Sequence, residues 1–359
     1  VTVGAMSEKQ HRIIIPGGSG FLGRTLTRWY ASRGCQVTIL SRDPAPVAPL
    51  VNANANANAN ANVNVIAWDG KNLGAWADHL DGADAVINLA GRSVNCRYHA
   101  ANRRMMMDSR IDSTLVLGKA IAACGNPPEI WLNSSTATIY RHRYDAANTE
   151  RDGLYGAARE AKDAFSLEVA HGWEDAFTKA YTDNDLQRTR GILLRTAIVL
   201  GNEPGGGYGT LRNLARVGLG GTMAGGRQFV SWIHERDFCR TLDWLIATRS
   251  ASGIYNIAAP NPLPNKAMMA AVRGAVGVPI GLPATRWMLE IGAFFLRTET
   301  ELIFKSRRVV PEHLLEEGFT FEFEGLPEAL ADLEGSRLSP IVSDCLRKIK
   351  RSGISAGRT

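Results

Sequence analysis

The sequence predicts an α/β protein: a Rossmann-like, doubly wound parallel sheet with a smaller C-terminal α+β substrate domain. Two observations lead to this fold class. Apolar, β-branched runs of strand length alternate with helical patterns over the first 200 residues, and the first run ends at a cluster of glycines. Strands that alternate with helices at this spacing form a parallel sheet that helices cover on both faces. An all-helical or all-β fold would need a different pattern.

The first βαβ unit opens this pattern. The β-branched run Arg12–Pro16 reads as a strand, and a second apolar strand follows at Cys35–Leu40. Between them, a helical pattern reaches Arg33 and is closed by Gly34, which suits a helix C-terminus because glycine tolerates left-handed dihedrals. Strand, glycine turn, helix and strand within about thirty residues are typical of a βαβ unit.

Further elements and a change of composition divide the chain. Strands are expected at 63–67, 85–91, 130–133, 191–200 and 319–323, and helices at 103–124 and 166–180. A glycine-rich stretch begins at Gly201, so we expect a cofactor domain over 11–200, a C-terminal substrate or cap region over 201–339 that packs on it, and a basic tail over 340–359. The Asn-Ala repeat between Asn52 and Asn64 is interpreted as a solvated loop or an artefact.

Composition and charge narrow the protein class. The 359 residues carry a formal net charge of +6, but the tail at 340–359 holds five basic side chains against one acidic one. The folded body is therefore close to neutral, and no nucleic-acid-binding module is visible. Five scattered cysteines and the absence of a long apolar run predict a reduced, cytoplasmic protein without membrane or nucleic-acid partners. A dimer is possible, residues 1–6 are interpreted as a leader or cloning remnant, and no metal-ligand spacing is found.

The glycine turn Gly17-x-x-Gly20-x-x-Gly23 carries the chemistry. The first glycine permits a tight turn, the second lets the backbone approach a pyrophosphate, and the third lets the helix pack on the strand. Free N–H groups at the helix start, around Phe21 and Leu22, would receive the phosphates. The turn follows a strand and opens a helix, so it predicts a dinucleotide site; a purely structural turn is the alternative.

The end of the second strand predicts NADP(H). An acidic residue there would bind a ribose 2′-hydroxyl, but this chain has Ser41-Arg42, a hydroxyl and a guanidinium that can hold a 2′-phosphate. Asp43 follows directly, and a turn could present it instead. Arg42 as a solvated surface cation is the other alternative. Arg24, in the first helical turn, is a second candidate phosphate partner.

Several separated motifs resemble the extended short-chain dehydrogenases, the group of sugar-nucleotide epimerases and dehydratases. The glycine turn, Asn88-Leu89-Ala90-Gly91 and the strand ending Ser134–Tyr140 carry this likeness. More motifs narrow it to an atypical branch with its own small C-terminal domain, which includes plant giant-chloroplast proteins and bacterial chains named as cell-division inhibitors. Those motifs are Asp108–Thr114, Gly218–Gly221, Gln228, Ser231–His234 and Arg308–Phe319. The likeness runs from about residue 12 to residue 333.

The resemblance implies an NADP(H) site and a catalytic set. Asp69, Leu89, Ala90 and Gly91 complete the cofactor residues that we expect. The wider superfamily uses Ser or Thr to hold the substrate, and a Tyr-x-x-x-Lys pair in which tyrosine moves the proton and lysine lowers its pKa. Such tuning is needed because a free phenol is a poor base at neutral pH. Thr136 lies where the hydroxyl belongs.

The Tyr-Lys pair is where this sequence departs from the superfamily. One alignment uses Tyr155 with Arg159, an exchange that is not conservative. The other uses Phe165–Val169, ahead of Trp173-Glu174, with neither tyrosine nor lysine. Trp173-Glu174 favours the second alignment, which makes Tyr155 an accidental match. Tyr140 is then the nearest phenol, and it is either an acid/base or a packed aromatic with a hydrogen-bonded tip.

Three residues after the glycine-rich loop are candidates for contact with a small-molecule substrate. Gln228, Trp232 and His234 lie there, and a histidine can move a proton near neutral pH. The alternative is a core tryptophan and a satisfied structural histidine. Two functions follow: an NADP(H)-dependent oxidoreductase or epimerase-like enzyme, or an NADP(H)-binding sensor with little or no turnover.

Overall fold

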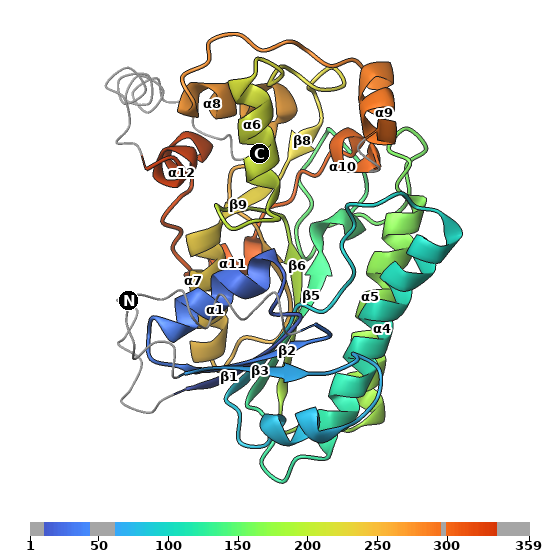
Figure 1. The fold of residues 1–359 in the computed structure, drawn as a ribbon, viewed down its shortest axis with the longest axis vertical. Helices are drawn as coiled ribbons and strands as arrows, with labels where there is room; N and C mark the ends of the chain where they lie inside the picture. Colours follow the sequence, from blue (N-terminus) through green and yellow to red (C-terminus); the bar gives the residue numbers. More distant parts are fainter. Residues whose placement is uncertain (1–10, 44–61, 296–298, 336–359) are drawn as a thin grey trace.

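A seven-stranded parallel sheet organises the computed structural model, which describes residues 11–43, 62–295 and 299–335 (Figure 1). The strand order is β10-β6-β5-β4-β1-β2-β3, which confirms the predicted fold class. The order reverses between β1 and β4, and in open α/β sheets ligands bind outside the carboxyl ends of the strands at such a point. The strands are β1 (Arg12–Pro16), β2 (Gln36–Ser41), β3 (Val63–Ala67), β4 (Ala85–Asn88), β5 (Ile130–Thr136), β6 (Arg190–Thr196) and β10 (Gly253–Ile257).

Helices bury both faces of this sheet. Ile13 and Ile15 of β1 face one core with α1 and α7, whereas Ile14 faces another core with α4 and α5. Successive side chains of a strand point to opposite faces, so a run of three isoleucines is what a doubly covered strand needs. Figure 1 shows α4 and α5 side by side on one flank and α1 with α7 on the other. These helices are α1 (Phe21–Ala31), α4 (Ala100–Ala122), α5 (Ala164–Asp183) and α7 (Glu235–Ala247), and a 3-10 helix η2 (Ala75–Leu80) precedes β4.

The C-terminal half forms a third core above the carboxyl ends of the strands (Figure 1). Two small sheets contribute to it, since β7 pairs with β9 and β8 pairs with β11. The remaining elements, which include η3 directly after β5, are η3 (Ala137–Ile139), β7 (Ile198–Leu200), α6 (Gly207–Arg216), β8 (Phe229–Val230), β9 (Trp232–His234), β11 (Leu263–Pro264), α8 (Asn265–Ala275), α9 (Arg286–Phe295), α10 (Glu301–Phe304), α11 (Glu312–Glu316) and α12 (Leu326–Leu333).

Two expectations change here. The strand expected at 319–323 does not form, because the Asp237 carboxylate of α7 takes the backbone N–H groups of Glu322 at 2.9 Å and Phe323 at 2.8 Å. The strand expected at 191–200 is split into β6 and β7, and β7 leaves the main sheet to pair with β9.

The domain division at residue 201 stays a prediction. The chain returns to the cofactor domain after that residue, since β10 lies in the main sheet beside β6. The Asn-Ala repeat up to residue 61, the first ten residues and the basic tail lie outside the described residues.

Within the described ranges, two kinds of feature are missing. No helix there is long and apolar enough to span a bilayer. No three Cys, His, Asp or Glu side chains of that part of the chain come together in a way that could hold a metal ion.

Candidate functional site

The glycine turn after β1 packs backbone against backbone. Gly17 has a φ of +79°, and a Cβ added to it would lie 2.7 Å from the Ala90 nitrogen that follows β4. A Cβ on Gly23 would lie 2.3 Å from Gly18 Cα. Real Cβ atoms do not approach so closely, so these two positions need glycine to join β1, α1 and the end of β4.

Gly20 is different, because nothing inside the protein requires glycine there. Its φ of −74° suits any residue, and an added Cβ would meet only the Gly17 carbonyl oxygen, at 3.6 Å. Gly20 is exposed at the start of α1, where no side chain caps the helix and the first turn holds no acidic residue. Uncapped N–H groups at a helix N-terminus, with open space beside them, fit the pyrophosphate of a dinucleotide. Phe21 and Leu22 supply the first helical amides.

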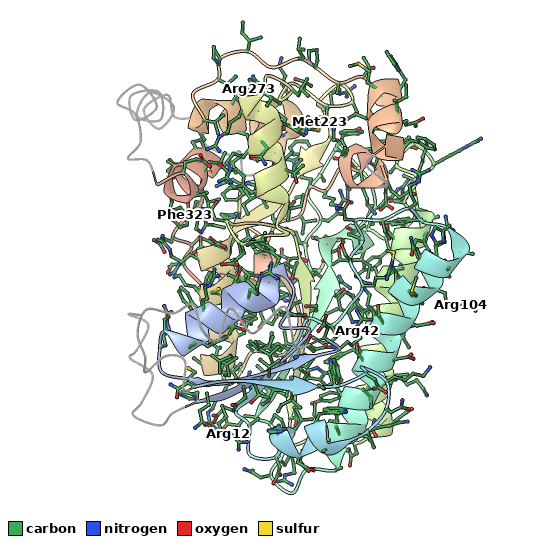
Figure 2. The ribbon with its side chains drawn as sticks, in the orientation of Figure 1. Arg12, Arg42, Arg104, Met223, Arg273 and Phe323 are labelled. Carbon is green, nitrogen blue, oxygen red and sulfur yellow. The ribbon has the colours of Figure 1, made fainter. Side chains whose placement is uncertain are left out.

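The end of β2 presents the two residues expected at a 2′-phosphate. The buried Ser41 hydroxyl lies 3.2 Å from the Ser19 hydroxyl of the glycine turn and donates to the Asp43 carbonyl at 2.7 Å. Arg42 is exposed beside it, near the middle of the molecule, whereas Arg12 lies at the opposite ends of the strands (Figure 2). The structure places Ser41 and Arg42 beside the glycine turn, and phosphate contact stays a prediction.

Arg24 connects the glycine turn to the segment after β7. Its guanidinium donates to the Ser19 carbonyl at 2.6 Å and to the Pro204 carbonyl, and it lies 3.5 Å from the Glu203 carboxylate. The same carboxylate pairs with Arg28. A phosphate at Arg24, as the sequence suggested, would therefore compete with Glu203.

Asp69 holds a turn directly after β3. Its exposed carboxylate accepts the backbone N–H groups of Lys71 at 2.8 Å and Asn72 at 2.9 Å, and the Asn72 side chain at 2.6 Å. These hydrogen bonds lower the pKa of Asp69 to about 2. The observed role of this carboxylate is in the turn, and the predicted cofactor contact is not tested.

The segment after β4 packs directly on the glycine turn. Leu89 donates its N–H to the Pro16 carbonyl at 2.9 Å, and the Ala90 N–H binds the Asn88 side chain at 3.0 Å. A Cβ on Gly91 would lie 3.1 Å from Arg110 Cζ, so the lack of a side chain at Gly91 leaves room for the buried guanidinium of Arg110. Burial lowers the pKa of Arg110 to about 10. The predicted cofactor residues 89–91 thus lie beside Gly17, at the switch point.

Thr136 ends β5, where the hydroxyl of the superfamily is expected. The side chain is partly exposed, and its oxygen accepts the Thr138 N–H at 3.1 Å. The Thr138 carbonyl accepts Lys305 Nζ at 2.6 Å, and the Thr138 hydroxyl accepts Arg307 Nε at 3.1 Å. The C-terminal region therefore reaches the residues directly after β5.

Tyr140 has the surroundings of a packed aromatic. It is 1% exposed, and its hydroxyl donates to Asn256 at 2.9 Å and accepts from Arg195 at 3.0 Å. Burial raises its pKa to about 12. A phenol with both hydrogen bonds used and a raised pKa is a poor acid/base, so the structure favours the packed alternative over the catalytic one.

Tyr155, the tyrosine of the less favoured sequence alignment, stacks on Tyr140 with ring centroids 5.8 Å apart. Its hydroxyl also accepts from Arg195, at 2.8 Å. Sequence reasoning missed the role of Glu174, which holds Arg195 through two hydrogen bonds of 2.9 and 2.7 Å and accepts the Ser135 hydroxyl at 2.5 Å. The sequence signal for this role was the Trp173-Glu174 pair, which served only to choose between the two alignments. This network ties β5 and β6 together near their carboxyl ends.

The three candidate substrate residues are buried, and each has partners inside the protein. The Gln228 amide donates to the Met223 carbonyl at 3.0 Å, and the Trp232 indole donates to the Asn261 carbonyl at 3.2 Å. His234 caps α7 by accepting the Arg236 N–H at 3.0 Å and lies 3.2 Å from the Asp332 carboxylate. These contacts favour the structural alternative for all three, because none has a polar group turned to an open site.

A pocket of about 630 Å³ lies between the starts of α4, α5 and α10. Its volume suits a small molecule. Sequence reasoning did not find this pocket, because its walls come from segments near residues 98, 160 and 300 that no motif connects.

A family profile decides the classification. The "NAD dependent epimerase/dehydratase family" profile matches residues 13–258, well over half of the chain. The chain belongs to this family. A second profile, "Domain of unknown function (DUF1731)", matches residues 284–333, which confirms the predicted branch with a C-terminal domain of its own.

Named relatives of this epimerase/dehydratase family member span nearly its whole length. "Epimerase family protein SDR39U1" of Bos taurus is 31% identical over 326 residues, which cover 90% of this chain and 99% of the relative. "Epimerase family protein MT2273" of Mycobacterium tuberculosis is 30% identical over 325 residues, covering 89% of this chain and 96% of the relative. The solved structure of human SDR39U1 (isoform2) with NADPH is similar at a TM-score of 0.73 and 26% identity, covering 91% of this chain and 100% of that one.

The glycine turn makes a first prediction about stability. Gly23→Ala should lower the free energy of unfolding by about 1–3 kcal/mol, because the new methyl group meets backbone atoms. Gly20→Ala should cost less, at most about 1 kcal/mol, because the site is exposed and its φ is ordinary, and only the preference of a helix N-cap for glycine over alanine is lost. Urea unfolding of both variants without cofactor measures the contrast, and equal losses would contradict it.

His234 makes a second prediction, on pH dependence. Burial lowers its pKa to about 4, and an unfolded histidine titrates near 6.5. The unfolded state therefore binds a proton first as the pH falls, so stability is present above about pH 6.5 and is lost towards pH 4. From pH 7 to 5 the wild type should lose about 2 kcal/mol more than His234→Asn, a variant that keeps a capping side chain. Urea denaturation at pH 7 and pH 5 measures this difference. An equal loss of unfolding free energy in the two proteins would contradict the prediction.

Proposed function

We propose that this chain binds NADP(H) and acts as an oxidoreductase or epimerase-like protein of the extended short-chain class, on a small or nucleotide-linked carbonyl or alcohol substrate. Gly20 is the observation that supports this proposal. No contact inside the protein requires glycine at this position, and the residue leaves open space at an uncapped helix N-terminus. When bound, NADP(H) supplies or accepts a hydride. The NADPH in the structure of human SDR39U1, a relative of similar length, supports the choice of cofactor.

The residues around the turn have distinct parts in this proposal. The amides at Phe21 and Leu22 hold the pyrophosphate, and the open face of Gly20 lets it approach the backbone. Ser41 and Arg42 hold the 2′-phosphate through a hydroxyl and a planar guanidinium. Thr136, at the end of β5, holds the hydroxyl or carbonyl oxygen of the substrate.

A second function is supported by the residues that replace the Tyr-Lys pair. Phe165 and Val169 are buried apolar side chains, and Tyr140 already uses its hydroxyl in two hydrogen bonds. None of the three can exchange a proton with a substrate in this arrangement. An NADP(H)-binding sensor or regulatory protein without turnover would keep the cofactor site and need no such pair.

Cofactor selectivity provides a third prediction. Arg42→Ala should weaken NADPH binding about tenfold or more and leave NADH binding nearly unchanged, because only NADPH carries the 2′-phosphate. Gly20→Ala should weaken the binding of both dinucleotides. Isothermal titration calorimetry measures these affinities. If the wild type bound neither dinucleotide, the cofactor assignment would fail, and with it both candidate functions.

Turnover provides a fourth prediction, and it separates the two functions. The wild type with NADPH should oxidise the cofactor when presented with a broad panel of carbonyl compounds, and Thr136→Ala should lose at least about 90% of that rate. Thr136→Ser, which keeps a hydroxyl, is the matched control and should retain most of it. NADPH absorbance at 340 nm follows the reaction. Tight NADPH binding without oxidation across the panel would support the sensor instead.

A further inference from the structure

The starts of α4, α5 and α10 lie on the same side of the molecule (Figure 1), and the pocket that residues near them line joins the two halves of the chain. The helices α4 and α5 follow β4 and β5, so they begin at the carboxyl ends of the strands, where ligands of such sheets bind. The third wall comes from Glu299–Glu301, inside the region of the domain of unknown function. Tyr98 and Phe165 form an aromatic wall with ring centroids 5.2 Å apart.

Glu301 lines this pocket, and one of its carboxyl oxygens has no hydrogen-bond partner in the part of the chain that the structure describes. Its residue is 4% exposed, one oxygen accepts the Ser166 hydroxyl at 2.5 Å, and the buried Oε1 has no hydrogen-bond partner among the described residues. A buried acceptor without a partner costs free energy unless a ligand or water binds it. Burial also raises the pKa of Glu301, so the group can carry a proton.

The other buried charges near the pocket are an ion pair and the Arg307 guanidinium, which interacts electrostatically with Glu301 and Asp163. Asp163 and Lys305 are both fully buried and form an ion pair of 2.7 Å. The second oxygen of Asp163 accepts the Ala158 N–H at 2.8 Å, and Lys305 also donates to the Thr138 carbonyl. The Thr138 N–H in turn donates to the Thr136 hydroxyl oxygen, so Lys305 and Thr138 link Asp163 of the pocket wall to the candidate substrate-holding group.

The exposed charges at the pocket leave a positive surplus. Lys162 pairs with Glu290 at 2.7 Å, and Glu299 accepts the Tyr98 N–H at 2.9 Å and lies 3.6 Å from Arg97. The two remaining cations that line it take part in no ion pair with a described residue. These are Arg103 and Arg159.

We infer that this pocket binds a small hydroxy or oxo compound with one anionic group. Its neutral oxygen would hydrogen-bond Glu301 Oε1, which accepts from a hydroxyl when charged and donates to a carbonyl when protonated. Its carboxylate or phosphate would lie next to Arg103 and Arg159. The inference rests on the proposed function, since it takes this pocket as the substrate site, and it gives the domain of unknown function a direct part in substrate binding.

Simple probes test each half of this inference on the full chain saturated with NADPH. In calorimetric titrations up to 50 mM, 3-hydroxybutyrate should bind at least about tenfold more tightly than 1,3-butanediol, which lacks the anion, and than butyrate, which lacks the hydroxyl. The affinity of glycerol 3-phosphate, compared with that of glycerol, tests the anionic group for a phosphate. The affinities of glycerol 3-phosphate and 3-hydroxybutyrate together show which anion is preferred. Equal affinities for the three four-carbon probes, together with no preference of the phosphate over glycerol, would overturn the inference. A lack of measurable binding of both 3-hydroxybutyrate and glycerol 3-phosphate would also overturn it.

Variants test the residues. Arg159→Ala should weaken binding of the anionic probes about tenfold, and Arg104→Ala, on the outer face of α4, is its matched control (Figure 2). Glu301→Leu, which removes both the acceptor and the donor, should weaken the binding of 3-hydroxybutyrate relative to that of butyrate, with the exposed Glu168→Leu of α5 as control. NADPH affinity should stay unchanged in all four variants. Retained NADPH binding with unaltered probe binding in Arg159→Ala and Glu301→Leu would contradict the pocket assignment alone, whereas a wild type that does not bind NADPH would contradict the proposed function.

Discussion

Close backbone contact at the turn after β1 is the constraint on which the site depends. Gly17 lies against the backbone at Ala90, and Gly23 lies against Gly18, at distances that leave no room for a Cβ. These contacts fix the start of α1 beside the end of β4, where the strand order reverses. The helix N-terminus is thereby held uncapped and exposed at the switch point. Gly20 alone is free of such contacts, which separates the glycine that suits a ligand from those that build the turn.

Buried charge pairs then position the C-terminal half over this end of the sheet. Lys305 and Asp163 join the region of unknown function to the start of α5, while Arg195 and Glu174 lock the ends of β5 and β6 through α5. Breaking a buried pair by removing one partner costs about 3–5 kcal/mol, so such pairs hold a defined geometry. The Lys305–Asp163 pair joins two of the three segments that form the pocket, those near residues 160 and 300.

Local pattern predicted most of the fold and the cofactor half of the site. The isoleucine run of β1 and the glycine spacing depend on neighbours in sequence, so the sheet, α1 and the position of Ser41 followed from them. The region around Thr136 was harder. Whether Tyr140 exchanges protons depends on Arg195 and Asn256, which lie 55 and 116 residues further along the chain.

The strand expected at 319–323 failed for a similar reason. Its backbone donors are taken by Asp237, a side chain that no periodicity in the segment reveals. Glu301 could likewise not be found from the sequence, because its importance comes from burial and from an oxygen that lacks a partner.

A crystal structure of the chain with NADPH is the most direct test of the proposed cofactor and substrate sites. The pyrophosphate should lie at the N-terminus of α1 beside Gly20, and nicotinamide C4 should face both Thr136 and the pocket that Glu301 lines. A nicotinamide turned away from that pocket, or phosphates bound elsewhere, would contradict this arrangement.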